Sequence, residues 1–253
     1  MTTAFDELRQ RLAEISDISR SAALLSWDQN VMMPRRGAPA RAEQLATLGR
    51  IAHERFVSPE VGRLLDELAP YAAEHDPDSF EARFVKVTRE DFEKASKVPT
   101  ELRVEMSRAA SLALPVWVEA RQNDDFAAFL PALRQNLELR RRYVACFDGD
   151  YDEPYDALLD DYERGLRSAE VRSLFDYLKQ HQAPLVQLVA GGEAPAPPAG
   201  RVFPIERQKE FELEVVGRFG FDTTAWRLDP TVHPFASSAS TRISDGRTVL
   251  ISR

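Results

Sequence analysis

The chain has 253 residues, of which 33 are basic and 41 acidic, so its formal net charge at neutral pH is −8. An acidic protein is a poor match for the phosphates of nucleic acids and for anionic membranes, and we expect neither as a partner. Apolar residues make up 43% of the chain, which suffices for a hydrophobic core and excludes disorder for most of it.

The sequence also bears on the compartment of the protein. A single cysteine, Cys146, excludes an intrachain disulfide. No run of about 18 apolar residues occurs, so no transmembrane helix is expected. The N-terminus, MTTAFDELRQ, includes acids and lacks the order of basic and then apolar residues that a signal peptide needs. These features predict a cytoplasmic protein.

Apolar residues recur every three or four positions from the N-terminus to residue 190, which is typical of amphipathic helices. A second helical stretch, around residues 22–27, is predicted to end at residues 33–39, where two prolines and a glycine oppose a helix. The first helix is indicated by a stripe of five residues: Phe5, Leu8, Leu12, Ile15 and Ile18.

Local signals predict where several helices begin and bend. Ser58, which is followed by a proline, and the acids at 124–125 have the chemistry of helix starts. Ser168 is predicted to cap a long helix that runs to about residue 188. Pro115 and Pro184 fall inside helical patterns, and we expect each to bend its helix because proline removes a backbone hydrogen bond.

The last part of the chain changes character. Residues 191–202 are rich in Gly, Pro and Ala and predict a solvated loop, followed by one more helix. Beyond residue 223, Ser and Thr are frequent, and the Asp245-Gly246 dipeptide precedes the β-branched, apolar residues 248–251. This pattern predicts a hairpin-like β-ribbon at the C-terminus.

Together these patterns predict a mainly α protein, with a multi-helix body, a kinked long helix and a short C-terminal β-ribbon. We expect a single domain over residues 1–253. It would comprise a helical body (1–190), the loop at 191–202, and a helix with the β-ribbon (203–253).

Zinc-dependent hydrolysis on a helix requires two histidines four residues apart with a glutamate between them, His-Glu-x-x-His. The chain has four histidines, and no two of them have this spacing. The nearest case is His53-Glu54, where Val57 stands at the second ligand position. We therefore predict no metal ligand and no cofactor for this chain, although a site assembled from distant residues stays open. The histidines are His53, His75, His181 and His233.

Other kinds of catalytic chemistry also find little support. No Gly-x-Ser-x-Gly elbow and no glycine-rich phosphate loop occur. Cys146 ends an amphipathic helix, where a small apolar role is more common than a nucleophilic one. His181 continues the apolar stripe of its helix, which favours a structural role. The sequence therefore predicts no catalytic residue.

Several segments nevertheless resemble one family. Residues 26–34, SWDQNVMMP, and 40–48, ARAEQLATL, look like the N-terminal region of the carboxypeptidase Taq family of thermostable zinc metallocarboxypeptidases. Residues 155–163, YDALLDDYE, and the triplet His233-Pro234-Phe235 follow in the family order. The resemblance covers essentially the whole chain but only about the first half of a family member.

The resemblance implies a helical body with a deep cleft, a homodimer, and zinc-dependent release of C-terminal residues from peptides. Asp245 and Arg247 match the family's Asp-x-Arg-x-Thr signature, whereas Val249 departs from it at the last position. In the family this signature and His-Pro-Phe lie at the cleft, so His233, Phe235, Asp245 and Arg247 are candidate substrate-binding residues. A structural role for His233 beside Pro234 is the competing interpretation.

Three functional hypotheses remain open. In the first, which we favour because the signature changes at Val249, the chain is a catalytically inactive relative, a pseudoenzyme used for binding, regulation or assembly. In the second, it is the N-terminal part of an active carboxypeptidase whose zinc-binding half comes from a missing segment or a partner chain. In the third, it is an enzyme that uses other residues.

The resemblance also has a consequence for association. Half of such a fold would expose apolar helix faces that in the whole fold pack in one core, and large apolar patches rarely stay solvated. We therefore expect a homodimer, with a peptide or a protein as a further partner.

Overall fold

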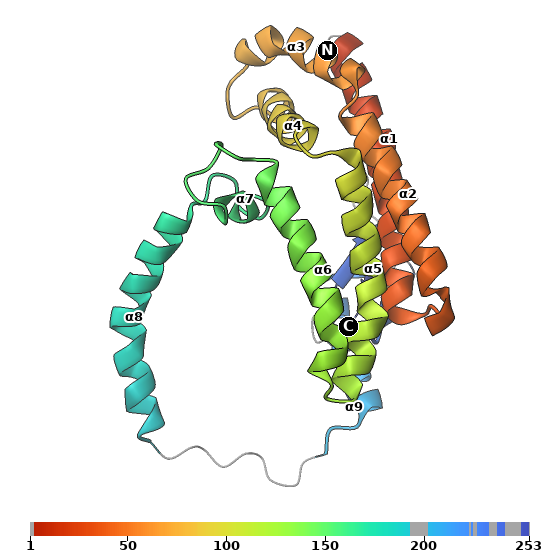
Figure 1. Ribbon diagram of the computed structural model, residues 1–253, viewed down its shortest axis with the longest axis vertical. Helices are drawn as coiled ribbons and strands as arrows, with labels where there is room; N and C mark the ends of the chain where they lie inside the picture. The colour runs from red at the N-terminus through yellow and green to blue at the C-terminus, as the bar shows by residue number, and fades with distance from the viewer. Residues whose placement is uncertain are drawn as a thin grey trace. The chain divides into compact units, whose positions relative to one another are not determined.

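The computed structural model describes residues 3–192, 202–222, 224, 227–232, 237–240 and 249–252. The chain is mainly helical, as the sequence predicts (Figure 1). The elements are α1 (Thr3–Val31), η1 (Arg35–Gly37), α2 (Ala38–Phe56), α3 (Pro59–Ala73), α4 (Phe80–Ser96), α5 (Thr100–Gln122), α6 (Phe126–Ala145), α7 (Asp156–Leu159), α8 (Ser168–Ala190), α9 (Ile205–Arg218), β1 (Arg227–Asp229), β2 (Ser237–Ser240) and β3 (Val249–Ser252).

The first two predicted helical stretches form one continuous helix, α1. It ends where Met33 donates its backbone N–H to the Asp28 carbonyl at 2.8 Å, just before Pro34 takes an extended conformation. Proline disfavours helical geometry in the residue before it, which explains the end of α1. After η1, α2 begins with Pro39 in its first turn, a position that needs no backbone N–H.

Two predicted helix starts are confirmed by their hydrogen bonds. The Ser58 hydroxyl accepts from the backbone N–H of Val61 at 3.5 Å, and Asp125 Oδ1 accepts from Ala128 at 3.0 Å. Each side chain therefore satisfies a backbone donor that the first turn leaves unpaired. Pro115 and Pro184 lie inside α5 and α8, and both helices continue past them.

The predicted start at Ser168 is only partly right. Helix α8 begins at this residue, but the cap position is Arg167, whose backbone N–H donates to Glu170 Oε2 at 3.0 Å. The Ser168 hydroxyl does not cap its own helix, because it donates to the buried carboxylate of Asp156 instead. The Ser168 hydroxyl, which the local sequence pattern predicts as a helix cap, therefore makes a tertiary hydrogen bond to Asp156 instead.

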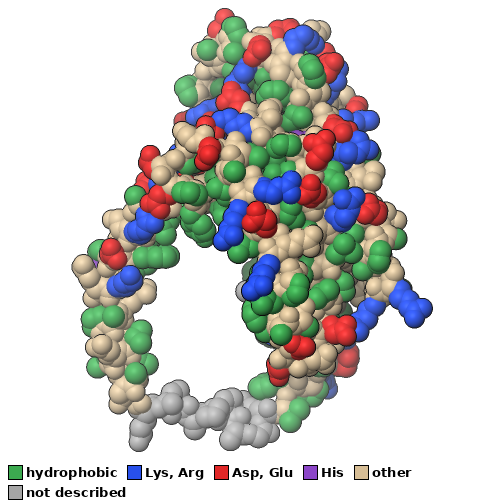
Figure 2. Space-filling view, in the orientation of Figure 1, with side chains coloured by type: hydrophobic (Ala, Val, Ile, Leu, Met, Phe, Trp, Pro, Cys, Tyr) green, Lys and Arg blue, Asp and Glu red, His purple; other side chains and the backbone are tan. Residues whose placement is uncertain are grey.

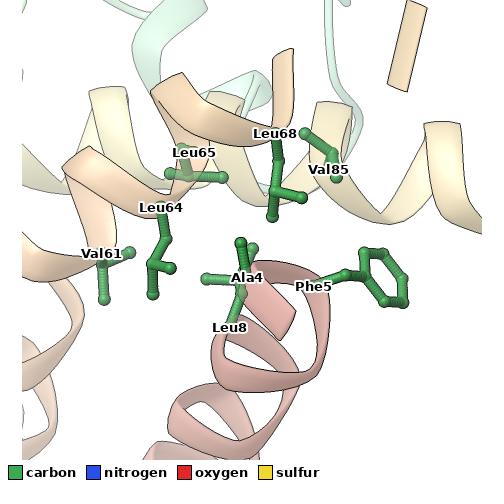
Figure 3. Close-up of a cluster of buried hydrophobic side chains, with 8 residues drawn as sticks. All are labelled: Ala4, Phe5, Leu8, Val61, Leu64, Leu65, Leu68 and Val85. Carbon is green, nitrogen blue, oxygen red and sulfur yellow. The ribbon is translucent and has the colours of Figure 1, made fainter. Parts of the chain in front are cut away.

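The chain forms two compact units, of which the first comprises Met1–Cys146 and Thr223–Arg253. Its best-packed core lies where the start of α1 meets α3 and α4 (Figure 3). The Phe5 ring is fully buried and packs against the Phe84 ring in an edge-type arrangement, with centroids 5.3 Å apart. The buried cluster comprises Ala4, Phe5, Leu8, Val61, Leu64, Leu65, Leu68 and Val85.

Helices α1, α2, α5 and α6 pack together in the same unit, where α2 packs against both α1 and α5, and α6 packs against α5 (Figure 1). A bidentate ion pair joins α5 to α2, because Arg108 donates to both carboxylate oxygens of Glu43 at 2.6 and 2.8 Å. A second pair, Arg142 with Glu105, joins α6 to α5. These exposed pairs align helices whose apolar sides supply most of the stability.

The C-terminal strands form a three-stranded sheet in the order β1-β3-β2. Strand β3 pairs antiparallel with β2, with Ser238 opposite Ile251, so the predicted ribbon is confirmed. The Asp245-Gly246 dipeptide expected at its turn lies outside the described residues. Strand β1, which pairs parallel with β3, was not predicted from the sequence. Strand β2 contacts α1, so the sheet packs against the helices of the first unit.

The second unit, Phe147–Asp222, contains α7, α8 and α9. The predicted loop at 191–202 lies mostly outside the described residues, and the expected single domain over residues 1–253 stays a prediction. Within the part of the chain that the structure describes, no helix is both long and apolar enough to cross a membrane.

Candidate functional site

The four predicted substrate-binding residues, His233, Phe235, Asp245 and Arg247, all lie outside the described residues. Their role therefore stays a prediction. The structure does describe the other segments that carry the family resemblance, and these segments occupy two places. One is a junction of helices in the first unit, and the other is the start of α8 in the second unit.

The junction begins with an ion pair between α1 and α2. Arg41 Nη2 lies 2.7 Å from Asp28 Oδ2, and the side chains of the two residues are only 13% and 33% exposed. The same guanidinium donates to the carbonyl of Leu25 and, through Nε, to Gln44 Oε1 at 3.1 Å. The planar fork of arginine is suited to several acceptors at once, so this one side chain fixes the turn between the helices.

A pair of reciprocal hydrogen bonds ties α1 to α5 beside this ion pair. Gln29 Nε2 donates to the backbone carbonyl of Ser111 at 2.8 Å, and the Ser111 hydroxyl donates back to Gln29 Oε1 at 2.9 Å. Ser111 is buried, at 7% exposed, so both groups would lose hydration without this partner. The amide therefore fixes the position of α1 along α5.

The segment before the predicted His-Pro-Phe signature reaches the same place. The Thr231 hydroxyl donates to the backbone carbonyl of Asn30 at 3.4 Å, and Thr231 precedes His233 by two residues in the sequence. We call this set of residues the motif junction, since it joins two segments of the family resemblance. It consists of Asp28, Gln29, Asn30, Arg41, Ser111 and Thr231.

The polar contacts of the motif junction serve to hold α1 against α2 and α5. Its carboxylate is neutralised by Arg41, the Gln29 amide and the Ser111 hydroxyl bond to each other, and the Thr231 hydroxyl donates to a backbone carbonyl. In the sequence, Asp28, Gln29 and Arg41 are identified only as parts of a family resemblance, and no pattern predicts the contacts that they make. The Gln29–Ser111 contact joins residues 82 apart, and no spacing in the sequence signals it.

The second place is centred on Asp156, whose side chain is buried at 1% exposed. Its Oδ1 accepts from the hydroxyl and the backbone N–H of Ser168 at 2.5 and 2.7 Å, and its Oδ2 accepts from the backbone of Glu153 at 3.2 Å. The hydroxyl of Ser168, and then its backbone N–H, hold the pKa of Asp156 below its usual value. The carboxylate is thus kept ionised and bound rather than available for acid–base work.

Further contacts surround this carboxylate within the second unit. Arg172 on α8 pairs with both carboxylate oxygens of Glu153, at 2.6 Å for the contact to Oε2, which lowers the pKa of that glutamate. The guanidinium of Arg167 lies 5.0 Å from the centroid of the Tyr151 ring. These contacts fold the segment after α6 against the first turn of α8, so the motif at 155–163 anchors a helix.

The sequence profile of the carboxypeptidase Taq (M32) metallopeptidases matches residues 7–248. The chain belongs to the carboxypeptidase Taq family. This confirms the resemblance predicted from the segments at 26–34 and 155–163. The first segment contributes side chains to the motif junction, and Asp156 of the second binds the start of α8.

Curated carboxypeptidases are similar to this chain over most of its length. The chain is 36% identical over 242 residues to Thermostable carboxypeptidase 1 of Thermus thermophilus, covering 92% of this chain and 48% of that protein. It is 34% identical over 229 residues to Carboxypeptidase 1 of Bacillus subtilis, covering 90% of this chain and 45% of the relative. The chain therefore spans about half the length of the curated relatives it matches.

Solved structures of carboxypeptidases share the fold. The crystal structure of BsuCP superposes on 99% of this chain and 49% of its own, with a TM-score of 0.88 and 30% identity. The Pyrococcus furiosus carboxypeptidase superposes on 100% of this chain and 50% of its own, with a TM-score of 0.78 and 29% identity. The predicted likeness to the N-terminal half of the family fold is thus confirmed.

The described residues do not fit the zinc ion that the family resemblance implies. Within the described ranges, no three His, Cys, Asp or Glu side chains are grouped so that they could hold a metal. Three histidines each place a ring nitrogen on a backbone carbonyl: His53 on Val98 at 3.1 Å, His75 on Tyr71 at 2.8 Å, and His181 on Tyr177 at 2.8 Å.

His53, the nearest match to a zinc motif, is a buried structural histidine. It is 8% exposed, and burial, followed by the nearby charge of Arg103, lowers the pKa of its imidazole. The neutral ring can thus bond to the Val98 carbonyl and hold the end of α2 near the start of α5.

Proposed function

We propose that this chain, by itself, is a catalytically inactive member of the carboxypeptidase Taq family that acts as a binding, regulatory or assembly protein. The observation that carries the proposal is the absence of His-Glu-x-x-His from all 253 residues. Hydrolysis of a peptide bond by this family's chemistry needs a group that polarises the carbonyl and activates a water. A chain without the paired histidines lacks the usual means of holding that group on a helix.

The geometry of the described residues supports this proposal. In the motif junction, Arg41 pairs with Asp28 and Ser111 bonds to Gln29, while Asp156 is fixed by Ser168 and Glu153. Both arrangements fix helices in place, which a binding protein needs as much as an enzyme does. We further propose that His233, Phe235, Asp245 and Arg247 line a surface that binds peptide, and that the protein is a cytoplasmic homodimer.

One observation favours a second candidate function. The chain spans about half the length of its curated relatives, and its structure superposes on about half of theirs. The second candidate is therefore the N-terminal part of an active, metal-dependent carboxypeptidase that releases C-terminal amino acids. In this case another polypeptide segment supplies the metal-binding half.

Elemental analysis of the purified chain, combined with an assay for release of C-terminal amino acids from a peptide, tests the first proposal. We expect less than stoichiometric zinc and no release above the rate without protein. Stoichiometric zinc together with release by the chain alone would overturn it. Release only after addition of the second half of Bacillus subtilis Carboxypeptidase 1 would support the second candidate.

A further inference from the structure

Helix α8 has an apolar surface that is too wide for a solvated helix. At 100° per residue, its exposed Leu, Phe and Val side chains fall within an arc of about 160° of the helix circumference. These side chains are strongly exposed, with values of 58% for Leu185 and 77% for Leu188. Figure 2 shows hydrophobic side chains along this helix. We define the α8 face as Leu174, Phe175, Leu185, Val186, Leu188 and Val189.

The charged residues of α8 are confined to its first half. Arg172 pairs with Glu153, and Lys179 lies 3.5 Å from Asp176. The second half, residues 180–190, carries no Asp, Glu, Lys or Arg. Within the second unit, no other described element packs along α8, and Ser168 is the one residue of the helix that is buried.

Helix α9 also exposes large apolar side chains. None of its residues is buried, and Ile205 and Phe211 are 68% and 66% exposed. Apolar surface in the second unit is therefore concentrated on helices that lack a covering layer among the described residues of that unit. By contrast, α3 of the first unit buries four apolar side chains in the cluster of Figure 3.

Packing, rather than helix propensity, is the usual source of stability for such a helix. A helix of 23 residues is about 34 Å long, and helices gain most of their stability from packing an amphipathic face. Pro184 lies inside α8, and a proline in a helix interior costs about 3 kcal/mol. Contiguous apolar patches above a few hundred Å² mark interaction sites. The α8 face is thus suited to a protein partner.

We propose that the α8 face docks the polypeptide that completes the carboxypeptidase Taq fold, a step that rests on the proposed role in binding or assembly. The relatives and solved structures match this chain, α8 included, over only about half of their own length. They therefore contain about as much chain again outside the matched part. A single helix of a second copy would cover only a narrow seam, whereas the apolar arc of α8 is about 160° wide. A multi-helix partner matches that width, and a homodimer would use another surface.

The test uses the full chain co-expressed with the part of Bacillus subtilis Carboxypeptidase 1 that it does not match. We expect a 1:1 complex by size exclusion with light scattering. The double substitution Leu185→Glu/Leu188→Glu should weaken this complex more than 100-fold. The control Gln180→Glu/Gln187→Glu adds the same charges on the polar side of α8 and should change affinity less than 2-fold.

A fusion of the two polypeptides gives a second measurement that does not depend on their association. Backbone amides of residues 168–190 should exchange hydrogen at least 10-fold more slowly in the fusion than in the chain alone. Equal exchange in the two proteins, or no complex in the first experiment, would overturn the proposal. So would equal weakening by the two double variants.

Other occupants give different results. If Leu185→Glu/Leu188→Glu turns a dimer of the chain into a monomer, the occupant is a second copy, and the proposal fails. If the same variant lowers the thermal midpoint of the chain alone by more than about 4 °C, the face is packed within the chain, and the proposal fails. The proposal that the chain alone is inactive is tested separately. Only peptide hydrolysis by the isolated chain would overturn it.

Discussion

Ser168 donates both its backbone N–H and its hydroxyl to a single oxygen of Asp156, at 2.7 and 2.5 Å. The two residues are 12 positions apart, and both are buried. The contact therefore ties the first residue of α8 to the first residue of α7. Because the carboxylate also accepts from the backbone of Glu153, three donors depend on Asp156.

Replacing this carboxylate should destabilise the second unit. We expect Asp156→Ala to lower the thermal midpoint by several degrees, because the buried donors of Ser168 and Glu153 would lose their acceptor. Ser168→Ala removes one of the three hydrogen bonds and should have a smaller effect. Circular dichroism during heating measures both. Asp148→Ala, at an exposed aspartate of the same unit, is the control, and an equal fall there would contradict the interpretation.

The same carboxylate should make stability depend on pH. Hydrogen bonds from Ser168 lower the pKa of Asp156 in the folded chain below its ordinary value of 3.8. Its contribution is therefore fully present above the ordinary value and is lost as the pH falls through the lowered pKa. Between pH 7 and about pH 3, the thermal midpoint should fall further in the natural chain than in Asp156→Asn. Parallel curves for the two proteins would show that Asp156 does not contribute in this way.

Local chemistry explains which parts of the fold the sequence predicts. The caps at Ser58 and Asp125 were predicted because donor and acceptor are three residues apart. The cap at Ser168 was assigned wrongly because the competing acceptor, Asp156, comes from another element. Strand β1 was missed because three residues form a strand here only through pairing with β3.

In the candidate site too, local sequence patterns could be predicted and tertiary contacts could not. The segment at 26–34 could be identified from its residues, and it does form part of a joint between helices. Its partners could not be predicted, because the Gln29–Ser111 contact and the Asn30–Thr231 contact join residues 82 and 201 apart. Such contacts depend on the packing of helices, which the spacing of residues along the chain does not specify.

The ion pair of the motif junction should be measurable by a double-mutant cycle. The variants Asp28→Asn, Arg41→Gln and their combination should give a coupling free energy of about 1 kcal/mol, because the pair is partly shielded from water. Urea unfolding of the four proteins measures it. The exposed pair of Arg63 and Glu67, on the surface of α3, should give a smaller coupling in the same experiment. A larger coupling there than at Asp28 and Arg41 would contradict the structural role of the junction.

The core at the start of α1 should be the most sensitive part of the first unit. Leu64 is 1% exposed and packs in the cluster of Figure 3, so Leu64→Ala would leave a cavity and cost about 2–5 kcal/mol. Leu137→Ala removes the same atoms from α6, where the residue is 50% exposed, and should cost less than about 1 kcal/mol. Urea unfolding followed by circular dichroism compares the two. Similar losses in both variants would mean that the cluster around Phe5 does not hold α1 against α3 as its burial implies.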